Sequence, residues 1–209
     1  MPGWSHNAYY HQLLLDLLPV RSQRILDVGC GTGAFAAKLA GRAERVDAVD
    51  CSEAMINQAR SRTPVNVNCV LADVLEDPLP GRNYDVIVSL SALHHLSLER
   101  ALPILATALR PGGRLVAIAL PRPDIPRELP VEVAAAVGYR LLGAVFSARR
   151  ALGRPDGFAQ DSADSMMPVV IDPSLTTRQV AAQAAQLLPG ARVRRLLFWR
   201  YLLTWEKPS

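Results

Sequence analysis

Short apolar runs and longer amphipathic segments follow one another along most of the chain. The apolar runs, rich in Val, Ile and Leu, lie at 25–28, 45–50, 65–73, 84–90 and 115–120. Segments with apolar residues at helical spacing follow at 34–40, 52–62 and 98–109. Strands that alternate with helices in this way predict an α/β domain, in which a parallel sheet is covered by helices on both faces.

The two ends of the chain add elements of a different kind. Residues 4–20 predict a helix whose apolar face carries Tyr10, Leu13, Leu14, Leu17 and Leu18. Near the other end, residues 176–188 predict a last helix with a threonine cap, and 192–199 and 200–207 predict two closing strands. Between 121 and 173 the regular alternation breaks, and an apolar stretch at 131–152 predicts a helix inside an insertion.

Composition excludes several classes of protein. A length of 209 residues suits one domain, and the apolar runs are shorter than the ~20 residues that span a bilayer. The N-terminus lacks the pattern of a signal peptide, so we expect a cytoplasmic protein. Three isolated cysteines predict neither a disulfide framework nor a metal site. The net charge of +4 is dispersed, which disfavours a nucleic-acid partner.

The chemistry is concentrated directly after the first apolar run. Asp27 is followed by Gly29, Gly31 and Gly33, which can adopt positive φ and bring the backbone close to a ligand before a helix begins. The spacing up to Ala34 also satisfies the fingerprint of dinucleotide-binding folds. From this loop alone, an NAD(P)-dependent oxidoreductase is an open alternative.

Residues 26–33, Leu-Asp-Val-Gly-Cys-Gly-Thr-Gly, resemble the first motif of class I S-adenosylmethionine (SAM)-dependent methyltransferases. The resemblance implies a Rossmann-like, mostly parallel seven-stranded sheet that ends in an antiparallel hairpin. It also implies that SAM is the cofactor and that Asp27 helps to hold its methionine end. Gly29, Cys30 and Gly31 would then form the bend under SAM. Asp27 could instead merely order this turn.

Acidic residues also end the next two predicted strands. Asp50 is placed where a carboxylate can accept both hydroxyls of a ribose, and the resemblance gives it that role. Cys51 and Met55 follow as candidates for contact with adenine, with plain core packing an equal alternative for Met55.

Residues 72–74, Ala72-Asp73-Val74, resemble a later family motif in which the acid binds the adenine amino group. An acid at the end of a third strand disfavours an NAD enzyme, which has no use for it. Alone, Asp73 could equally be a turn residue.

The fourth predicted strand and the Leu-His-His that follows it resemble small-molecule methyltransferases related to the ubiquinone and menaquinone C-methyltransferases. This places Leu90 beside the cofactor. His94 is a candidate general base, because histidine can exchange a proton near neutral pH. For His95 we favour a role in shaping the loop. Tyr10 is a second catalytic candidate.

We therefore predict one SAM-dependent methyltransferase domain over 1–209. By resemblance, residues 1–20 form a lid over the cofactor, although a surface helix is an equal alternative, and 121–173 form a substrate cover. The expected reaction is methylation of an oxygen, nitrogen or carbon of a small molecule, with a specialised metabolite as one candidate. A monomer or homodimer without a metal is expected. Besides the oxidoreductase, a non-catalytic SAM-binding protein is an alternative.

Overall fold

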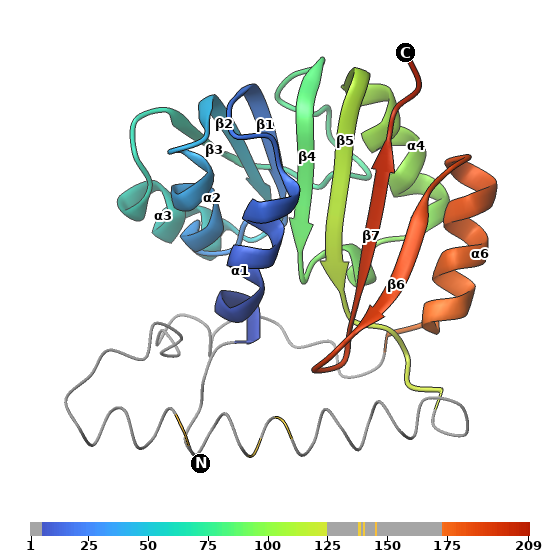
Figure 1. Ribbon diagram of the computed structural model, residues 1–209. Helices are drawn as coiled ribbons and strands as arrows, with labels where there is room; N and C mark the ends of the chain where they lie inside the picture. The colour runs from blue at the N-terminus through green and yellow to red at the C-terminus, as the bar shows by residue number, and fades with distance from the viewer. Residues whose placement is uncertain (1–5, 125–137, 139, 141–144, 146–172) are drawn as a thin grey trace.

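One seven-stranded sheet runs through the molecule (Figure 1). The computed structural model describes residues 6–124, 138, 140, 145 and 173–209. The strands are β1 (Ser22–Val28), β2 (Ala43–Asp50), β3 (Val67–Leu71), β4 (Tyr84–Leu90), β5 (Leu109–Ala119), β6 (Arg192–Leu196) and β7 (Arg200–Glu206). Their spatial order is β3-β2-β1-β4-β5-β7-β6. The first five strands are parallel and β7 is antiparallel to both of its neighbours, which confirms the predicted sheet.

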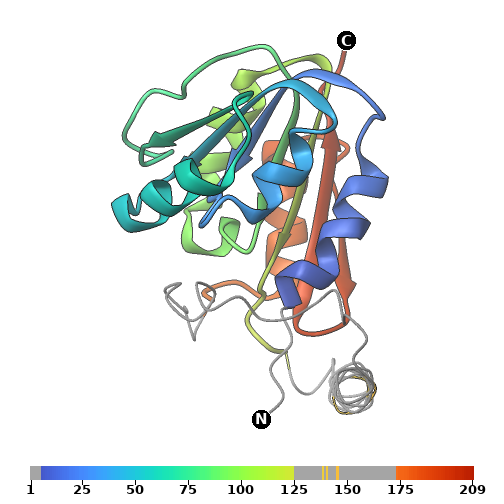
Figure 2. The ribbon, with the colours of Figure 1, turned by 90° about the vertical axis from the view of Figure 1, so that its left-hand side faces the viewer.

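Helices cover both faces of this sheet. They are α1 (His6–Leu17), α2 (Ala34–Leu39), α3 (Glu53–Arg62), the short 3₁₀ helix η1 (Leu93–His95), α4 (Leu98–Ala108) and α6 (Thr177–Leu187). Figure 2 shows α1 and α6 on opposite sides of the C-terminal strands. None of the described helices is long and apolar enough to cross a membrane.

Local capping residues set where two helices begin. The Ser52 hydroxyl accepts a hydrogen bond from the Met55 amide at 3.4 Å, which satisfies one of the free donors in the first turn of α3. Thr176 and Gln179 form a reciprocal capping box at the start of α6. The threonine cap of α6 was predicted from the sequence.

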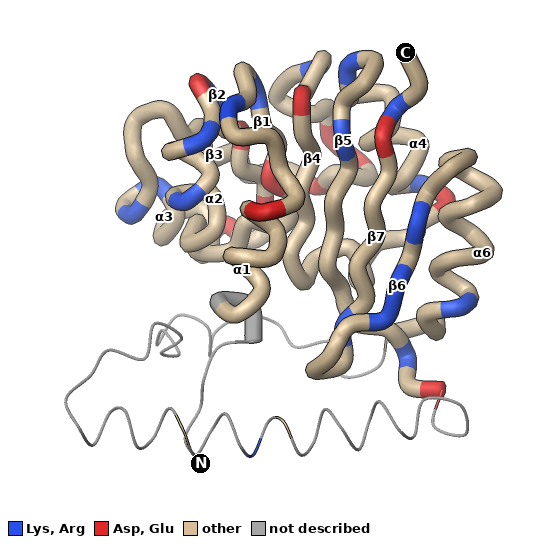
Figure 3. The backbone as a smooth tube through the Cα atoms, in the orientation of Figure 1, with Lys and Arg blue, Asp and Glu red and all other residues tan. Residues whose placement is uncertain are grey.

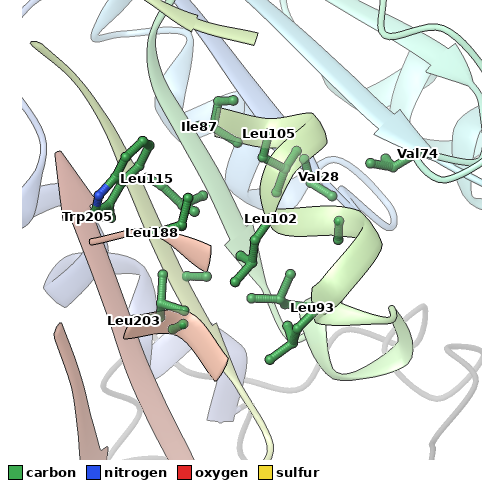
Figure 4. Close-up of a cluster of buried hydrophobic side chains, with 14 of the residues drawn as sticks. Val28, Val74, Ile87, Leu93, Leu102, Leu105, Leu115, Leu188, Leu203 and Trp205 are labelled. Atoms are coloured by element: carbon green, nitrogen blue, oxygen red, sulfur yellow. The ribbon is translucent and has the colours of Figure 1, made fainter. Parts of the chain in front are cut away.

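Alternating side chains on the strands build a hydrophobic core on each face. Ile25 and Val88 belong to the core that α1, α2 and α3 cover. Their neighbours Leu26 and Ile87 belong to the core that α4 and α6 cover. Figure 4 shows this second core, in which side chains from η1, α4 and the strands meet. The strands are therefore buried on both sides, as their near-continuous apolar runs predicted.

Several predicted boundaries were wrong because hydrogen bonds to distant strands decide them. β5 begins at Leu109 rather than at 115, because residues 110–114 continue the strand. The Gly112 amide donates to the Lys207 carbonyl, and the Lys207 amide donates to the Gly113 carbonyl, both at 2.9 Å. A register shift opposite Tyr84 and Val86 accommodates the extra residues.

Other elements also differ from their predicted lengths. The predicted strand at 65–73 is shorter, Val67–Leu71, and β1 begins three residues earlier than predicted. β6 ends at Leu196 because the next three residues form the hairpin turn. The predicted helix at 131–152 lies outside the described residues, except for Gly138, Arg140 and Val145, which are helical.

Candidate active site

The glycine loop between β1 and α2 has the backbone that only glycine adopts readily. The φ angles of Gly29, Gly31 and Gly33 are +72°, +54° and +78°. A Cβ at Gly29 would lie 2.1 Å from the Ala92 Cβ, and one at Gly33 would lie 2.8 Å from Thr63 Cγ2. The loop is thus packed tightly against the segment after β4 and against the end of α3, which leaves no room for a side chain at positions 29 and 33.

Asp50 ties this loop to the start of α3. Its Oδ2 accepts a hydrogen bond from the Gly31 amide and its Oδ1 accepts one from the Ser52 amide, both at 2.9 Å. The carboxylate therefore stands at the carboxyl end of β2 directly beside the glycines. That is the position in which a carboxylate can bind the hydroxyls of a ribose.

Asp27 is a buried acid with an unsatisfied oxygen. Only 1% of its surface is exposed, and Oδ2 has no hydrogen-bond partner among the described residues. Burial, and secondarily the charge of Asp50, raise the pKa of Asp27 to about 7. A buried carboxylate without donors is costly, and a cationic or N–H-bearing group of a ligand would supply them. This site therefore fits the ammonium group of SAM.

Asp73 lies after β3 and forms a turn. Its Oδ1 accepts a hydrogen bond from the Leu75 amide at 2.8 Å, and its own amide donates to Asp77 Oδ2 at 2.8 Å. Ala72 joins the same edge, because its amide donates to the Asp50 carbonyl at 3.0 Å. Both Ala72 and Val74 are buried. The structure thus shows the turn-forming role, and the contact with adenine stays a prediction.

The sulfur-containing candidates occupy different environments. Cys30 is buried in the core and Cys51 is exposed at the end of β2. Met55 is 4% exposed, yet it belongs to neither hydrophobic core formed by the described residues. Met55 lies on the first turn of α3, and its contact with adenine stays a prediction, as does that of Cys51.

The segment after β4 departs from ordinary backbone geometry. Ser91, directly after the half-buried Leu90, has a φ of +59°, and its amide donates to the Ile118 carbonyl at 2.7 Å. Such strain in a non-glycine residue clusters at functional sites. The same segment then turns into η1, so the two histidines are presented from the carboxyl end of the sheet.

His94 and His95 stack on each other, with ring centroids 4.1 Å apart. Nδ1 of His94 is buried without a hydrogen-bond partner among the described residues. Burial, with help from His95 and Arg200, lowers the pKa of His94 to about 3. Burial also lowers the pKa of His95, while the charge of Asp50 opposes this effect. Of the two histidines, His95 is therefore the one whose pKa the charge of Asp50 affects, which the sequence did not indicate.

Tyr10 holds α1 against the C-terminal hairpin. Its hydroxyl donates to the Leu197 carbonyl, and its ring packs edge-on against Tyr9 with centroids 5.1 Å apart. Burial raises the pKa of Tyr10 to about 12, so the phenol stays protonated at neutral pH. The structure thus gives Tyr10 an anchoring contact, and its catalytic role stays a prediction.

Two features escaped the sequence analysis. Arg200 is buried at the start of β7 with an unpartnered Nε. Asp47 is fully buried on β2 and receives hydrogen bonds from Arg24, Asn68 and Tyr84. An acid inside an apolar run signals a buried partner. For Arg200 no local signal existed, because its burial depends on the hairpin.

Comparisons with known proteins agree with this geometry. Residues 25–113 match the model of a family described as a methyltransferase domain. The chain is 34% identical over 207 residues to an uncharacterized methyltransferase of Mycobacterium tuberculosis, covering 98% of each protein. It is 36% identical over 110 residues to 27-O-demethylrifamycin SV methyltransferase of Amycolatopsis mediterranei, covering 49% of this chain and 40% of that protein.

Solved structures with the same fold include methyltransferases of low sequence identity. The N-methyltransferase NodS of Bradyrhizobium japonicum superposes with a TM-score of 0.58 at 18% identity, covering 96% of each chain. A complex described as DhpI–SAM–HEP superposes with a TM-score of 0.63 at 19% identity, covering 96% of this chain and 85% of the other. These findings set aside the oxidoreductase alternative.

Proposed function

Because the chain belongs to the class I SAM-dependent methyltransferases, we propose that it transfers the methyl group of SAM to an oxygen, nitrogen or carbon of a small molecule. A relative that matches half of this chain is named for methylation of a rifamycin, which is a small molecule. The proposal includes the predicted substrate cover at 121–173, most of which lies outside the described residues. Gly138, one of the described residues in this segment, lies close to Phe198: a Cβ at Gly138 would be 3.6 Å from the Phe198 ring.

Three acids are proposed to hold the cofactor. Asp50 accepts hydrogen bonds from the ribose hydroxyls, Asp27 accepts them from the ammonium group, and Asp73 accepts one from the adenine amino group. When bound, SAM would supply a methyl group on a positively charged sulfur: an electron pair of the acceptor would form the new bond as the carbon–sulfur bond breaks, leaving S-adenosylhomocysteine (SAH), and the proton displaced from the acceptor would pass to solvent. The chain's own task is to orient the acceptor in line and to exclude water.

His94 is proposed to contact the acceptor. At neutral pH its imidazole is uncharged, and its buried Nδ1 has no partner among the described residues. It can therefore accept a hydrogen bond from an acceptor O–H or N–H. A pKa of about 3 makes full proton transfer costly, so we expect His94 to polarise and orient this group more than to deprotonate it.

The observation that carries the cofactor roles is the unsatisfied oxygen of Asp27 next to the glycine loop. Titration calorimetry with SAH tests it. We expect Asp50→Ala and Asp27→Asn each to weaken SAH binding by about tenfold or more, because each removes a charge-assisted contact. Glu206→Gln, an exposed acid on β7, is the control and should bind like wild type. Unchanged affinity in both site variants would contradict these roles.

The pH dependence of SAH binding gives an independent test. The ligand ammonium requires ionised Asp27, whose pKa is raised to about 7 in the free protein. SAH affinity should therefore fall as pH drops below about 7, approaching tenfold per pH unit. In Asp27→Asn this pH dependence should disappear. A flat profile for the wild-type protein would exclude Asp27 from the ammonium site.

The small-molecule part of the proposal needs its own experiment. SAM labelled in its methyl group is incubated with the protein and an extract of the source organism, which is then separated by size. Label in the low-molecular-mass fraction is expected, and an Asp50→Ala protein should give none. Label confined to protein or nucleic acid would contradict the substrate class while leaving the methyltransferase activity intact.

A further inference from the structure

Arg200 carries a buried charge that the cofactor site does not use. Only 8% of its surface is exposed. Nη1 donates to the Trp199 carbonyl at 3.3 Å and the Phe198 carbonyl at 3.5 Å, both long for hydrogen bonds. Nε is buried and has no hydrogen-bond partner among the described residues. The ion pairs between the described residues involve other arginines. Burying a guanidinium without a counter-ion is costly, so an anion is missing from this environment.

Among the described residues, the ionisable groups whose charges act on Arg200 are Tyr10 and Arg195, and neither is a carboxylate. Nη1 of Arg195 donates to the Arg200 carbonyl at 3.3 Å, which brings a second guanidinium to the same end of the hairpin. Figure 3 shows basic residues along β6 beside it. The pKa of Arg200 is lowered to about 10, mainly by burial, and stays high enough to keep it charged at neutral pH. The positive potential here favours an anionic ligand.

Arg200 lies at the end of the sheet where methyl transfer is proposed. Tyr201 pairs with Ala119, so Arg200 lies one position beyond the end of β5. Side chains two positions apart on a strand point to the same face, so Arg200 shares a face with Leu202, and Asp27 shares one with Ile25. Leu202 and Ile25 belong to the same hydrophobic core, so all four side chains lie on one face of the sheet. His94 lies at the same end of the sheet, because η1 follows the carboxyl end of β4.

The turn before Arg200 is strained. Phe198 and Trp199 have φ angles of +53° and +57°, a conformation that costs bulky residues of the order of 1–3 kcal/mol each. Strain of this kind persists where surrounding contacts fix it, and it clusters at ligand sites. Tyr10 supplies one such contact through the Leu197 carbonyl.

We propose that Arg200 binds an oxyanion, a carboxylate or a phosphate, carried by the methyl acceptor, so that the enzyme selects acidic small molecules. This inference rests on the proposed small-molecule methyl transfer and specifies its substrate class. A guanidinium presents its Nε–H and an Nη–H in a planar fork that matches two oxygens of a carboxylate or phosphate. Because Nε of Arg200 has no partner among the described residues, its N–H can donate to such an oxygen. The acceptor would be anchored here and would extend its nucleophile past His94 toward the cofactor.

Three probes that share one ring test the proposal on the SAH-saturated protein by calorimetry or NMR titration. Benzoate and phenyl phosphate carry the oxyanion, and benzamide is the neutral control. We expect the preferred oxyanion to bind about tenfold or more tightly than benzamide, because a charge-assisted hydrogen bond is worth more than a neutral one. Which of the two anions binds more tightly distinguishes a carboxylate from a phosphate site.

Variants separate this role from a structural one. Arg200→Met should abolish the preference for the oxyanion, while Arg194→Met, at an exposed position on the neighbouring strand, should keep it. Because Arg200→Met removes a buried unpaired charge, its melting temperature should equal or exceed that of the wild type. If Arg200→Met does not fold, Arg200→Lys decides: a retained preference supports the proposal and a lost one overturns it.

Two further results would overturn the proposal. One is an oxyanion preference that survives in Arg200→Met. The other is a fall of SAH affinity by about tenfold or more in Arg200→Met, which would assign the guanidinium to the cofactor carboxylate instead. If the wild-type protein bound no SAH, the proposed methyl transfer itself would be contradicted, independently of Arg200.

Discussion

Asp27 and Asp47 are two buried aspartates on neighbouring strands with opposite surroundings. They lie one position apart in the pairing of β1 with β2, since Asp47 pairs with Leu26 and Asp27 pairs with Ala48. The exposed fractions are 1% for Asp27 and 0% for Asp47. Asp47 is surrounded by donors, whereas Oδ2 of Asp27 has no partner among the described residues.

The difference in donors reverses the effect of burial on each acid. Burial by itself would raise the pKa of Asp47, but hydrogen bonds from Asn68, Arg24 and Tyr84 outweigh burial and lower it. No such donor reaches Oδ2 of Asp27 among the described residues, and burial raises the pKa of Asp27 to about 7. A buried acid with hydrogen-bond donors around it stabilises the fold, whereas a buried acid that lacks them is the one proposed to bind the ammonium group of the cofactor. The following changes test this distinction, from the largest expected effect to the smallest.

Asp47→Ala should have the largest effect on stability. It leaves Arg24 and Tyr84 without their common acceptor in a buried site, so we expect a loss of about 3–5 kcal/mol in the free energy of unfolding. Urea unfolding at pH 7 measures it. Glu206→Gln, which breaks an exposed pair with Arg114, is the control and should cost less than about 1 kcal/mol. A cost for Asp47→Ala as small as that of the control would refute its structural role.

Arg24→Met should cost about 2 kcal/mol by the same measurement, because Arg24 both pairs with Asp47 at 2.7 Å and packs over Gly81. Arg45→Met is the matched control on the same carboxylate. Arg45 is more exposed and its contact is longer, 3.3 Å, so its loss should cost about 0.5 kcal/mol or less. Equal costs for the two arginines would show that burial does not set the strength of these pairs.

Asp27→Asn should stabilise the cofactor-free protein by about 2 kcal/mol at pH 8. The pKa of Asp27 is higher in the folded than in the unfolded state, so wild type loses stability as pH rises from about 4 to 7. The variant should lack this loss, and the two proteins should converge near pH 4. Thermal unfolding across this range measures it. A destabilised variant at pH 8 would reveal a structural partner for Asp27.

Tyr84→Phe should have the smallest effect. It removes one hydrogen bond, from the Tyr84 hydroxyl to Asp47 at 3.0 Å, and leaves the other donors of that acid in place. We expect a loss of about 1 kcal/mol in urea unfolding and unchanged SAH binding. Combined with Arg24→Met, the loss should differ from the sum of the single losses, because both residues bond to one carboxylate. Strict additivity would argue against a shared network.

The sequence by itself determined the order of the elements and most of the cofactor loop. Apolar runs, amphipathic segments, helix caps and glycines are local features, and local features set secondary structure and turn geometry. Asp27 and Asp50 could be named for the same reason, since each lies at or near the end of an apolar run. Gly29 could be named as well, but the reason that it must be glycine, the approach of Ala92 within 2.1 Å of a Cβ, comes from the fold.

Only the tertiary structure decided which polar groups have partners. Arg24 lies 23 residues from Asp47 along the chain and meets it only because β1 and β2 pair. The burial of Arg200 depends on a hairpin that inserts against β5, and the start of β5 depends on hydrogen bonds to Lys207. Burial and the supply of donors are properties of contacts between distant segments. They determine whether a buried charge has a partner within the protein, and no local pattern in the sequence predicts this.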